Sequence, residues 1–242
     1  MSKNDQKAAL VTGAGRGIGR AVAVALAREG YALCLAARTR EELEETRRLT
    51  GLAPERALIV LIDLAGEESP EALFSAALDH FERIDVLVNN AGWAPPRSAV
   101  QKTSDADQDR MMAVNLRAPI ALTRLAAREM TKHRAGAIIN IASSAGRMAP
   151  AFEAIYAATK AGLIAFSRAC FAELRQSGIK VSLIIPGLVD TALIPHNKRL
   201  ERRVMLSAEQ VAAAVVQVIN SPASVCPVEI VIEPQFDPER PR

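Results

Sequence analysis

Short aliphatic runs alternate with amphipathic segments along almost the whole chain, and this alternation constrains the fold more than any other feature. The runs have the length of strands and are nearly unbroken by polar residues, which is typical of parallel strands buried on both faces; they are Ala8–Val11, Ala32–Ala36, Ala57–Ile62, Val86–Val88, Ala137–Ile141, Val181–Ile185 and Val228–Ile232. The segments between them have helical patterns, at Gly17–Glu29, Arg40–Thr50, Pro70–Glu82, Asp105–His133, Ile155–Gln176 and Ser207–Ile219. The alternation predicts an α/β fold, a doubly wound, seven-stranded parallel sheet with helices on both faces.

The composition excludes several classes of protein. The 242 residues carry 30 Lys and Arg against 27 Asp and Glu, a formal charge of +3, and only one Trp, two Tyr and six Phe. So small a charge and so few aromatic rings argue against nucleic-acid binding. No apolar run approaches the roughly 18 residues of a membrane-spanning helix, and the opening MSKNDQK lacks the apolar stretch of a signal peptide. We therefore expect neither a nucleic-acid nor a membrane partner.

Cysteine usage bears on location and on metal binding. Cys34, Cys170 and Cys226 lie far apart and form no C-x-x-C pair, and the three histidines are also scattered. This pattern excludes a disulfide framework and a thiolate metal site, and it favours a reducing, cytoplasmic location. No metal site is expected.

A glycine-rich turn follows the first predicted strand. Residues 12–19 read TGAGRGIG, and the spacing of Gly13, Gly17 and Gly19 departs from the strict G-x-G-x-x-G pattern. Glycines between a strand and a helix let the backbone approach a pyrophosphate, whose charge is met by the helix N-terminus. A tight connection can also require glycine for steric reasons alone.

The end of the second predicted strand bears on which dinucleotide would bind. Many NAD sites have a carboxylate there for the ribose hydroxyls, whereas residues 36–39 read Ala-Ala-Arg-Thr. Arg38, together with Arg16 in the glycine turn, offers planar cations suited to a 2′-phosphate. We therefore expect NADP(H) rather than NAD(H), although both arginines could instead be solvated surface residues.

Tyr156 and Lys160 are four residues apart on a predicted helix, so both side chains lie on one face. A nearby ammonium lowers the pKa of a tyrosine from about 10 and makes Tyr156 a general acid toward a carbonyl oxygen, or a base toward an alcohol. Ser143 is 13 positions earlier (156 − 143 = 13), at the end of a strand where its hydroxyl can bind the same oxygen. Ser144 is the neighbouring candidate, and Y-x-x-x-K alone is common on ordinary helices.

Taken in order, these motifs resemble those of the short-chain dehydrogenase/reductase family. The resemblance also includes Asp63 after the third strand, the N-N-A-G sequence at residues 89–92, Asn115, and Pro186-Gly187 followed by Thr191, and it covers roughly residues 7–191. It implies a single Rossmann-fold domain over residues 1–242. Its motifs occupy about 7–191, a substrate-covering loop about 192–206, and the last helix, last strand and tail 207–242.

The resemblance also implies roles for particular residues. The catalytic set is Asn115, Ser143, Tyr156 and Lys160, in which Asn115 holds a water in a proton relay and Lys160 binds the nicotinamide ribose. The implied cofactor-binding residues are Gly13, Gly15, Arg16, Gly17, Ile18, Gly19, Arg38, Thr39, Asp63, Leu64, Asn90, Ala91, Gly92, Tyr156, Lys160, Pro186, Gly187, Val189 and Thr191. Thr191 could instead be a helix cap, and Asn89 and Asn90 could serve loop backbone groups.

The expected reaction interconverts a carbonyl and a primary or secondary alcohol by hydride transfer with NADP(H), with Tyr156 as general acid or base and without a metal. The chain resembles the carbonyl reductase or 3-oxoacyl reductase-like branch. A catalytically silent NADPH-binding regulator of the same fold is the alternative, which the intact set of catalytic residues argues against. An enoyl reductase is disfavoured because that branch spaces its tyrosine and lysine more widely.

Position in the chain gives the expected substrate contacts, and the same regions suggest partners. A small-molecule substrate is expected to meet Trp93, Ser143, Arg147, Phe152 and His196. The basic run 196–203 suits an anionic substrate or acyl thioester, or is a solvated loop. The ending VEIVIEP departs from the family's glycine-rich V-D-G-G type, which leaves tetramer assembly through that end open. A homodimer or homotetramer is expected through the two longest helices, although covering the sheet would equally explain their apolar faces.

Overall fold

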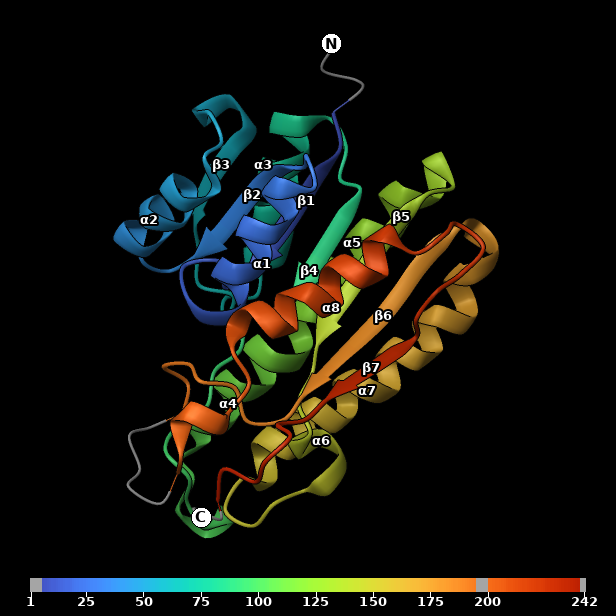
Figure 1. Ribbon diagram of the computed structural model, residues 1–242. Coiled ribbons are helices and arrows are strands. Elements are labelled where there is room, and N and C mark those ends of the chain that lie inside the picture. The colour runs from blue at the N-terminus through green and yellow to red at the C-terminus, as the bar shows by residue number, and fades with distance from the viewer. Residues whose placement is uncertain (1–5, 195–199, 240–242) are drawn as a thin grey trace.

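The computed structural model describes residues 6–194 and 200–239. Its strands form one parallel, seven-stranded sheet in the order β3-β2-β1-β4-β5-β6-β7 (Figure 1). They are β1 (Ala8–Thr12), β2 (Ala32–Ala37), β3 (Ala57–Leu61), β4 (Val86–Asn89), β5 (Gly136–Ile141), β6 (Ile179–Pro186) and β7 (Glu229–Ile232). The predicted α/β fold is confirmed.

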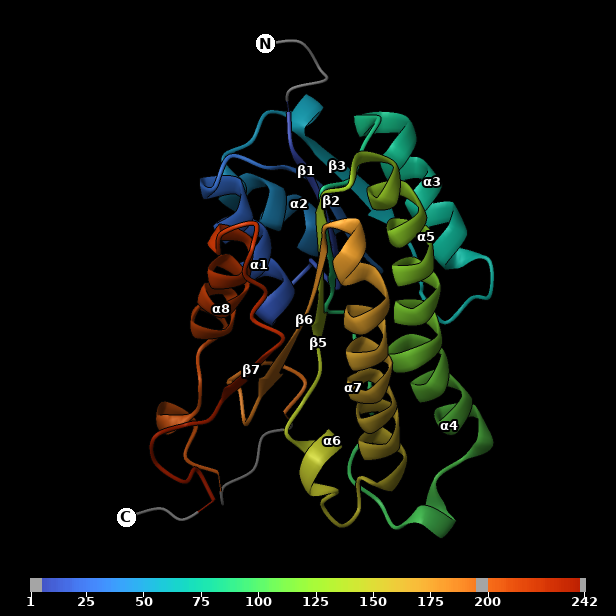
Figure 2. The ribbon, with the colours of Figure 1, turned by 90° about the vertical axis from the view of Figure 1, so that its right-hand side faces the viewer.

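Helices cover both faces of the sheet (Figure 2). One face carries α1, α2 and α8, and the other carries α3, α5 and α7. The α-helices are α1 (Gly17–Arg28), α2 (Arg40–Thr50), α3 (Ser69–Phe81), α4 (Asp105–Met112), α5 (Ala118–His133), α6 (Ala145–Met148), α7 (Ala154–Leu174) and α8 (Ala208–Asn220). Most bounds fall within two or three residues of the prediction, because hydrophobic periodicity and helix-ending glycines identify them.

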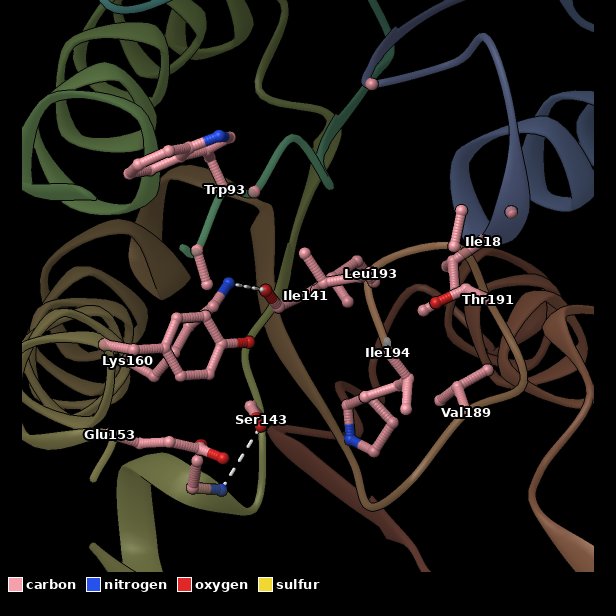
Figure 3. A pocket seen from close by; sticks show the side chains of 18 of the residues that line it. Ile18, Trp93, Ile141, Ser143, Glu153, Lys160, Val189, Thr191, Leu193 and Ile194 are labelled. Carbon is pink, nitrogen blue, oxygen red and sulfur yellow. Dashed lines mark hydrogen bonds between the residues drawn. The ribbon is translucent and has the colours of Figure 1, made fainter. Parts of the chain in front are cut away.

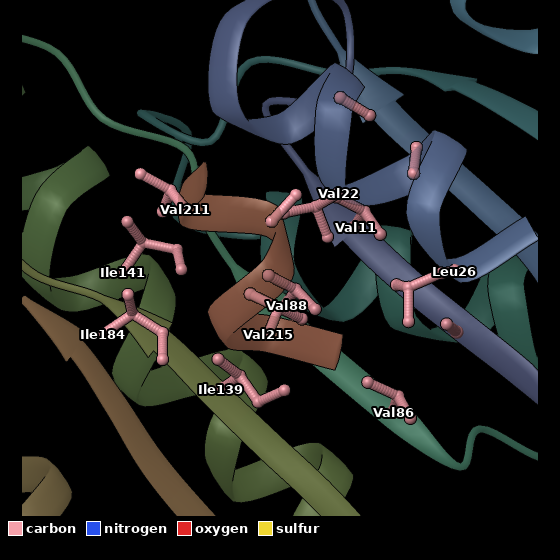
Figure 4. Packing of buried hydrophobic residues seen from close by; sticks show 14 of the residues in the cluster. Val11, Val22, Leu26, Val86, Val88, Ile139, Ile141, Ile184, Val211 and Val215 are labelled. Carbon is pink, nitrogen blue, oxygen red and sulfur yellow. The ribbon is translucent and has the colours of Figure 1, made fainter. Parts of the chain in front are cut away.

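Alternate side chains of each strand feed two separate core layers. In β1, Ala9 and Val11 face α1 and α8, whereas Ala8 and Leu10 face the opposite layer under α3 and α5. Figure 4 shows the first layer, where Val22 and Leu26 of α1 and Val211 and Val215 of α8 pack onto the strands. Because a strand buried on both faces needs apolar residues at every position, its sequence is a continuous aliphatic run.

The single helix predicted over Asp105–His133 is wrong at its centre. A π-helical turn, Ala113–Arg117, separates α4 from α5. Pro119, in the first turn of α5, has no N–H to give to the carbonyl of Asn115 four residues earlier, so the regular helical ladder cannot continue there. The turn contains Asn115, which is fully buried.

The strand order reverses between β1 and β4, and this reversal positions the site. In open parallel sheets, the loops at such a switch point diverge and leave a crevice at the carboxyl ends of the strands. Here the loops after β1 and β4 are held together by Thr12, whose Oγ1 accepts the N–H groups of Asn90 and Ala91, each at 3.0 Å. The loops on either side of the crevice therefore have a fixed relative position.

Candidate active site

A cavity of about 1270 Å³ lies at the carboxyl ends of the strands. Its walls come from the glycine turn, the ends of β2 to β6, the start of α7, and the segment that follows β7. Figure 3 shows Trp93, Ser143, Glu153 and Lys160 on one side of it, with the loop that carries Thr191 and Leu193 across from them. The volume exceeds what a drug-sized ligand fills and is sufficient for a dinucleotide beside a small molecule.

The glycine turn has the backbone shape that its glycines permit. Gly13 and Gly17 have φ of 64° and 53°, values that other residues seldom adopt. The side-chain amide Nδ2 of Asn90 donates to the carbonyl oxygens of Thr12 at 2.9 Å and Gly13 at 3.3 Å, which fixes the first bend of the turn. The glycines and the hydrogen bonds from Asn90 therefore fix the backbone conformation of the turn.

Gly19 has a packing role that the sequence did not indicate. Of the described residues, Gly13, Gly15, Arg16, Gly17 and Ile18 line the cavity, and Gly19 does not. A Cβ on Gly19 would overlap the carbonyl oxygen of Gly13 and lie 2.5 Å from Nδ2 of Asn90. Glycine is therefore required here for close packing of the first helical turn against the loop, and a direct contact of Gly19 with the cofactor stays a prediction.

The region beside β2 and β3 is rich in arginine. Arg38 and Thr39 line the cavity and are exposed, and Asp63 and Leu64 lie across from them. Arg16 forms an ion pair with Glu42 of α2 at 3.5 Å, a partner that the sequence argument missed. Because Arg16 and Glu42 come from different segments, only the fold brings them together.

Asp63 has a cationic partner, Arg110 of α4, that the sequence did not indicate. Its carboxylate accepts from Arg110 of α4 at 2.7 Å and from the N–H of Ala65 at 3.1 Å. Burial raises the pKa of Asp63. These two donors and the charge of the nearby Arg38 lower the pKa by more than burial raises it, so that the net shift is downward. Arg110 also lies over the ring of Trp93, 5.5 Å from its centroid, and lines the cavity.

Ser143, Tyr156 and Lys160 line one part of the cavity. Ser143 follows β5, and the other two project from the first turns of α7. The Lys160 ammonium is buried; it donates to the carbonyl of Ile141 at 3.0 Å and lies 5.8 Å from the centroid of the Tyr156 ring. Ser144 also lines the cavity, but it is the Ser143 hydroxyl that acts on the phenol of Tyr156.

Burial dominates the electrostatics of this group. It lowers the pKa of Lys160 from 10.5 to about 8. It also raises the pKa of Tyr156 from 10.0 to about 12; the Ser143 hydroxyl lowers this pKa and the charge of Glu153 raises it. The expected lowering by Lys160 is therefore wrong, because the ammonium faces the ring and a carbonyl rather than the phenol oxygen, and burial penalises the phenolate.

Asn115 has a structural task that the sequence did not indicate. Of the described residues it is not among those that line the cavity, and both ends of its amide engage Trp93. Its Nδ2 donates to the Trp93 carbonyl and its Oδ1 accepts the Trp93 N–H, each at 2.8 Å. The side chain of Asn115 therefore anchors the loop after β4, and its proposed water contact stays a prediction.

Asn90 serves loop backbone groups, as the alternative interpretation of the sequence allowed, whereas Asn89 bonds mainly to other buried side chains. The amide of Asn89 is buried and donates to Oδ1 of Asn140 at 2.8 Å, and Asn140 in turn donates to Oγ of Ser167 at 2.8 Å. This chain of hydrogen bonds joins β4, β5 and α7 below the cavity. Asn90, Ala91 and Gly92 do line the cavity.

The loop after β6 closes one side. Pro186, Gly187, Val189 and Thr191 line the cavity, and a Cβ on Gly17 would lie 3.2 Å from Cγ2 of Thr191. Thr191 therefore lies against the glycine turn.

Arg202 of the basic run holds this loop in place through hydrogen bonds. Arg202 donates to Oδ1 of Asp190 at 2.7 Å and to the carbonyls of Thr191 at 2.9 Å and Ile194 at 3.1 Å. Arg203 pairs with Glu201. These two cations of the run are thus engaged within the protein.

Of the expected substrate contacts, Trp93, Ser143 and Phe152 line the cavity. Arg147 is not among the described residues that line it and pairs instead with Glu229 of β7, so its substrate contact stays a prediction that the structure does not support. The sequence gives no sign of this pair because 82 positions separate its members. His196 lies outside the described residues.

The tail contributes to the cavity, which the sequence did not indicate. Beyond β7 the chain lines the cavity with Glu233, Pro234, Gln235, Asp237, Pro238 and Glu239. The carbonyl of Pro238 accepts the N–H of Glu201 at 2.9 Å, which ties the tail to the loop after β6. Its prolines indicated only an irregular end, and nothing local indicated where that end packs.

No three His, Cys, Asp or Glu side chains of residues 6–194 and 200–239 are grouped so as to hold a metal ion. Within the same residues, no helix is both long enough and apolar enough to cross a bilayer.

Comparisons with known proteins place this geometry among relatives. Residues 7–201 match the model of the short chain dehydrogenase family. An uncharacterised oxidoreductase of Staphylococcus epidermidis is 33% identical over 237 residues, covering 97% of this chain and 100% of the relative. One of Staphylococcus aureus is 32% identical over 234 residues, with the same coverage. A metagenomic short-chain oxidoreductase, crystallised in complex with NADP, is 32% identical with a TM-score of 0.83, covering 96% of this chain and 98% of that one.

Proposed function

The chain belongs to the short-chain dehydrogenase family of oxidoreductases, and from this premise we propose that it interconverts a carbonyl compound and an alcohol with NADP(H). One observation carries the proposal: a single cavity contains Ser143, Tyr156 and Lys160 as well as the glycine turn and Arg38. A group that moves a proton and a cradle for a dinucleotide are thus placed together, as this reaction needs.

The residues fit an NADP(H) molecule. The glycine turn offers a concave backbone at the N-terminus of α1, where side chains on Gly13 would strike Asn90 and Ala91. Arg38 and Arg16 would hold the 2′-phosphate, and residues 36–39, directly at the end of β2, include no carboxylate to repel it. The similar oxidoreductase crystallised with NADP supports this choice.

In the proposed mechanism, NADP(H) supplies or accepts the hydride, and the chain manages the substrate oxygen. Ser143 binds that oxygen and Tyr156 transfers its phenolic proton to it. With its pKa raised to about 12, Tyr156 is protonated at neutral pH, which suits a general acid in carbonyl reduction. Lys160, with a pKa of about 8, remains largely cationic at neutral pH beside the expected position of the ribose.

We also propose that copies of the chain associate. A groove lined by Met112, Leu116 and Ile120 lies along α4 and the start of α5, and Met112 and Ile120 are 42% and 36% exposed. Apolar side chains in an open groove favour a self-complementary contact of the kind found in dimers. Sedimentation of the purified protein measures the assembly.

The decisive experiment follows NADPH oxidation at saturating cofactor over a panel of ketones, aldehydes and 3-oxoacyl thioesters. We expect turnover of at least one carbonyl class, and a loss of roughly 100-fold or more in Tyr156→Phe, because a positioned general acid contributes about that much. Tyr31→Phe is the matched control, since Tyr31 precedes β2 and does not line the cavity among the described residues.

Two outcomes would contradict the proposal. Tight NADPH binding without turnover of any carbonyl would favour the silent regulator, and turnover unchanged in Tyr156→Phe would remove the assigned acid. Repeating the assay with NADH tests the cofactor, for which a preference for NADH would overturn the choice of NADP(H).

A further inference from the structure

The cavity is electrically polarised along its length. Beside the glycine turn and the ends of β2 and β3 it is lined by Arg16, Arg38 and Arg110 against two carboxylates. Beside Ser143 and Gly187 the acids outnumber the cations among the described residues, whose charged members there are Arg97, Lys160, Glu153, Glu233, Asp237 and Glu239. A phosphate-bearing cofactor suits the first part, and the second part is where the proposed substrate lies.

Arg97 is shared between two of these carboxylates. It pairs with Glu153, whose side chain is 15% exposed, and lies 3.9 Å from Glu239 of the tail. It comes from the loop after β4, so this contact joins three segments that are distant in sequence. The single positive charge of Arg97 is thus shared by two carboxylates and does not also neutralise a third.

Glu233 is the carboxylate that lacks such a partner. No hydrogen bond or ion pair to it exists within the described residues. Its Oε2 lies so close to Gly187 that a Cβ there would overlap it. Glu233 is an exposed residue whose partial burial raises the pKa of its carboxyl, and no cation of residues 6–194 and 200–239 lowers that pKa. The departure of the sequence from a glycine-rich ending therefore places an uncompensated acid at the end of β6, next to the expected nicotinamide position.

Exposed apolar side chains line the same cavity as this acid. Met148, Phe152 and Leu193 line it and are 68%, 63% and 44% exposed. Exposed apolar side chains around a few polar groups are characteristic of a binding surface for a small molecule. The cavity thus offers a hydrocarbon-binding wall and a negative charge.

We propose that Glu233 recognises a cationic substituent on the substrate, which is a carbonyl compound or alcohol with a protonated amine and an apolar body. This rests on the proposed function and deepens it. The amine replaces the missing partner of Glu233, while the apolar body covers Met148 and Phe152. Within the described residues an anionic substrate or acyl thioester meets repulsion here, because Arg202 and Arg203 are already engaged by Asp190 and Glu201.

A matched set of three ligands tests the proposal. They are a methyl ketone with a terminal dimethylammonium group, the isostere in which CH replaces the nitrogen, and the keto acid of the same chain length. Each is titrated calorimetrically into protein saturated with NADP⁺, which has no hydride to give, so binding is measured without turnover. We expect the ammonium ketone to bind about fivefold more tightly than its isostere, the upper range for a solvent-accessible ion pair.

Glu233→Gln is expected to remove this preference and to leave binding of the isostere and of NADP⁺ within about twofold. Glu209→Gln, on the exposed first turn of α8, makes the same change of charge elsewhere and keeps the preference. An equal preference in wild type and Glu233→Gln, or tightest binding of the keto acid, would overturn the assignment. Because binding is measured apart from reduction, failure of all three ketones to be reduced by NADPH counts against the proposed function alone.

Discussion

Lys160 is a cation buried in the fold. The free energy that its burial costs the folded state can be measured as a pH dependence of the free energy of unfolding. The side chain is 4% exposed and its pKa falls from 10.5 to about 8 because burial disfavours the charged form. At about 1.4 kcal/mol for each tenfold change in proton affinity, the charged form costs the folded state about 3 kcal/mol. The hydrogen bond to the carbonyl of Ile141 offsets only part of what burial removes.

The sign follows from proton binding. Below about pH 8, Lys160 is charged in both the folded and unfolded states, and the full cost is present. Between pH 8 and 10.5 the unfolded chain holds the proton and the folded protein does not, so stability rises with pH. Lys160→Met removes this rise. Between about pH 7.5 and pH 10, the free energy of unfolding of the wild type should therefore increase by about 2 kcal/mol relative to that of the variant.

Urea unfolding followed by circular dichroism, at several pH values and with reductant present, measures this difference. Lys102→Met, in an exposed turn outside the cavity lining, is the control and should have the pH dependence of the wild type. The upward pKa of Tyr156 acts on wild type and variant alike above about pH 10, so it cancels in the comparison. A constant free-energy difference between wild type and Lys160→Met over this range would refute the reasoning.

Two further predictions concern the cofactor region. Gly19→Ala places a Cβ against the carbonyl of Gly13, so we expect a loss of about 1–3 kcal/mol in unfolding free energy and weaker NADPH binding. Thermal unfolding with and without NADPH measures both, and Gly30→Ala, where a Cβ has open space but φ is positive, separates the packing effect from backbone strain. Arg38→Ala should raise the KM for NADPH by roughly tenfold or more and leave the KM for NADH nearly unchanged, because a charge-assisted contact to a 2′-phosphate is lost. Equal effects on both cofactors would contradict that contact.

Much of the fold could be predicted because its signals are local. A strand buried on both faces requires an unbroken aliphatic run, as in β1 and β5, and a helix on the sheet requires an apolar stripe. The interruption at Ala113–Arg117 was missed, although Pro119 was visible in the sequence as a residue that removes a helical hydrogen bond. The glycine turn was recognisable because its positive φ values allow little else than glycine.

The side-chain partners at the site could not be predicted. Arg147 pairs with Glu229, Arg16 pairs with Glu42, and the amide of Asn115 is taken up by the backbone of Trp93. Each partnership depends on which segments the sheet topology brings together, which periodicity along the chain does not encode.

The sequence by itself determined the alternating strands and helices, the tight turn after β1 and the placement of Tyr156 and Lys160 on one helical face, because each depends on residues a few positions apart. Only the tertiary structure decided that burial would raise the pKa of Tyr156, and that Glu233 in the tail would lie in the cavity. Desolvation and charge pairing depend on every segment that surrounds a group, so they exist only once the chain has folded.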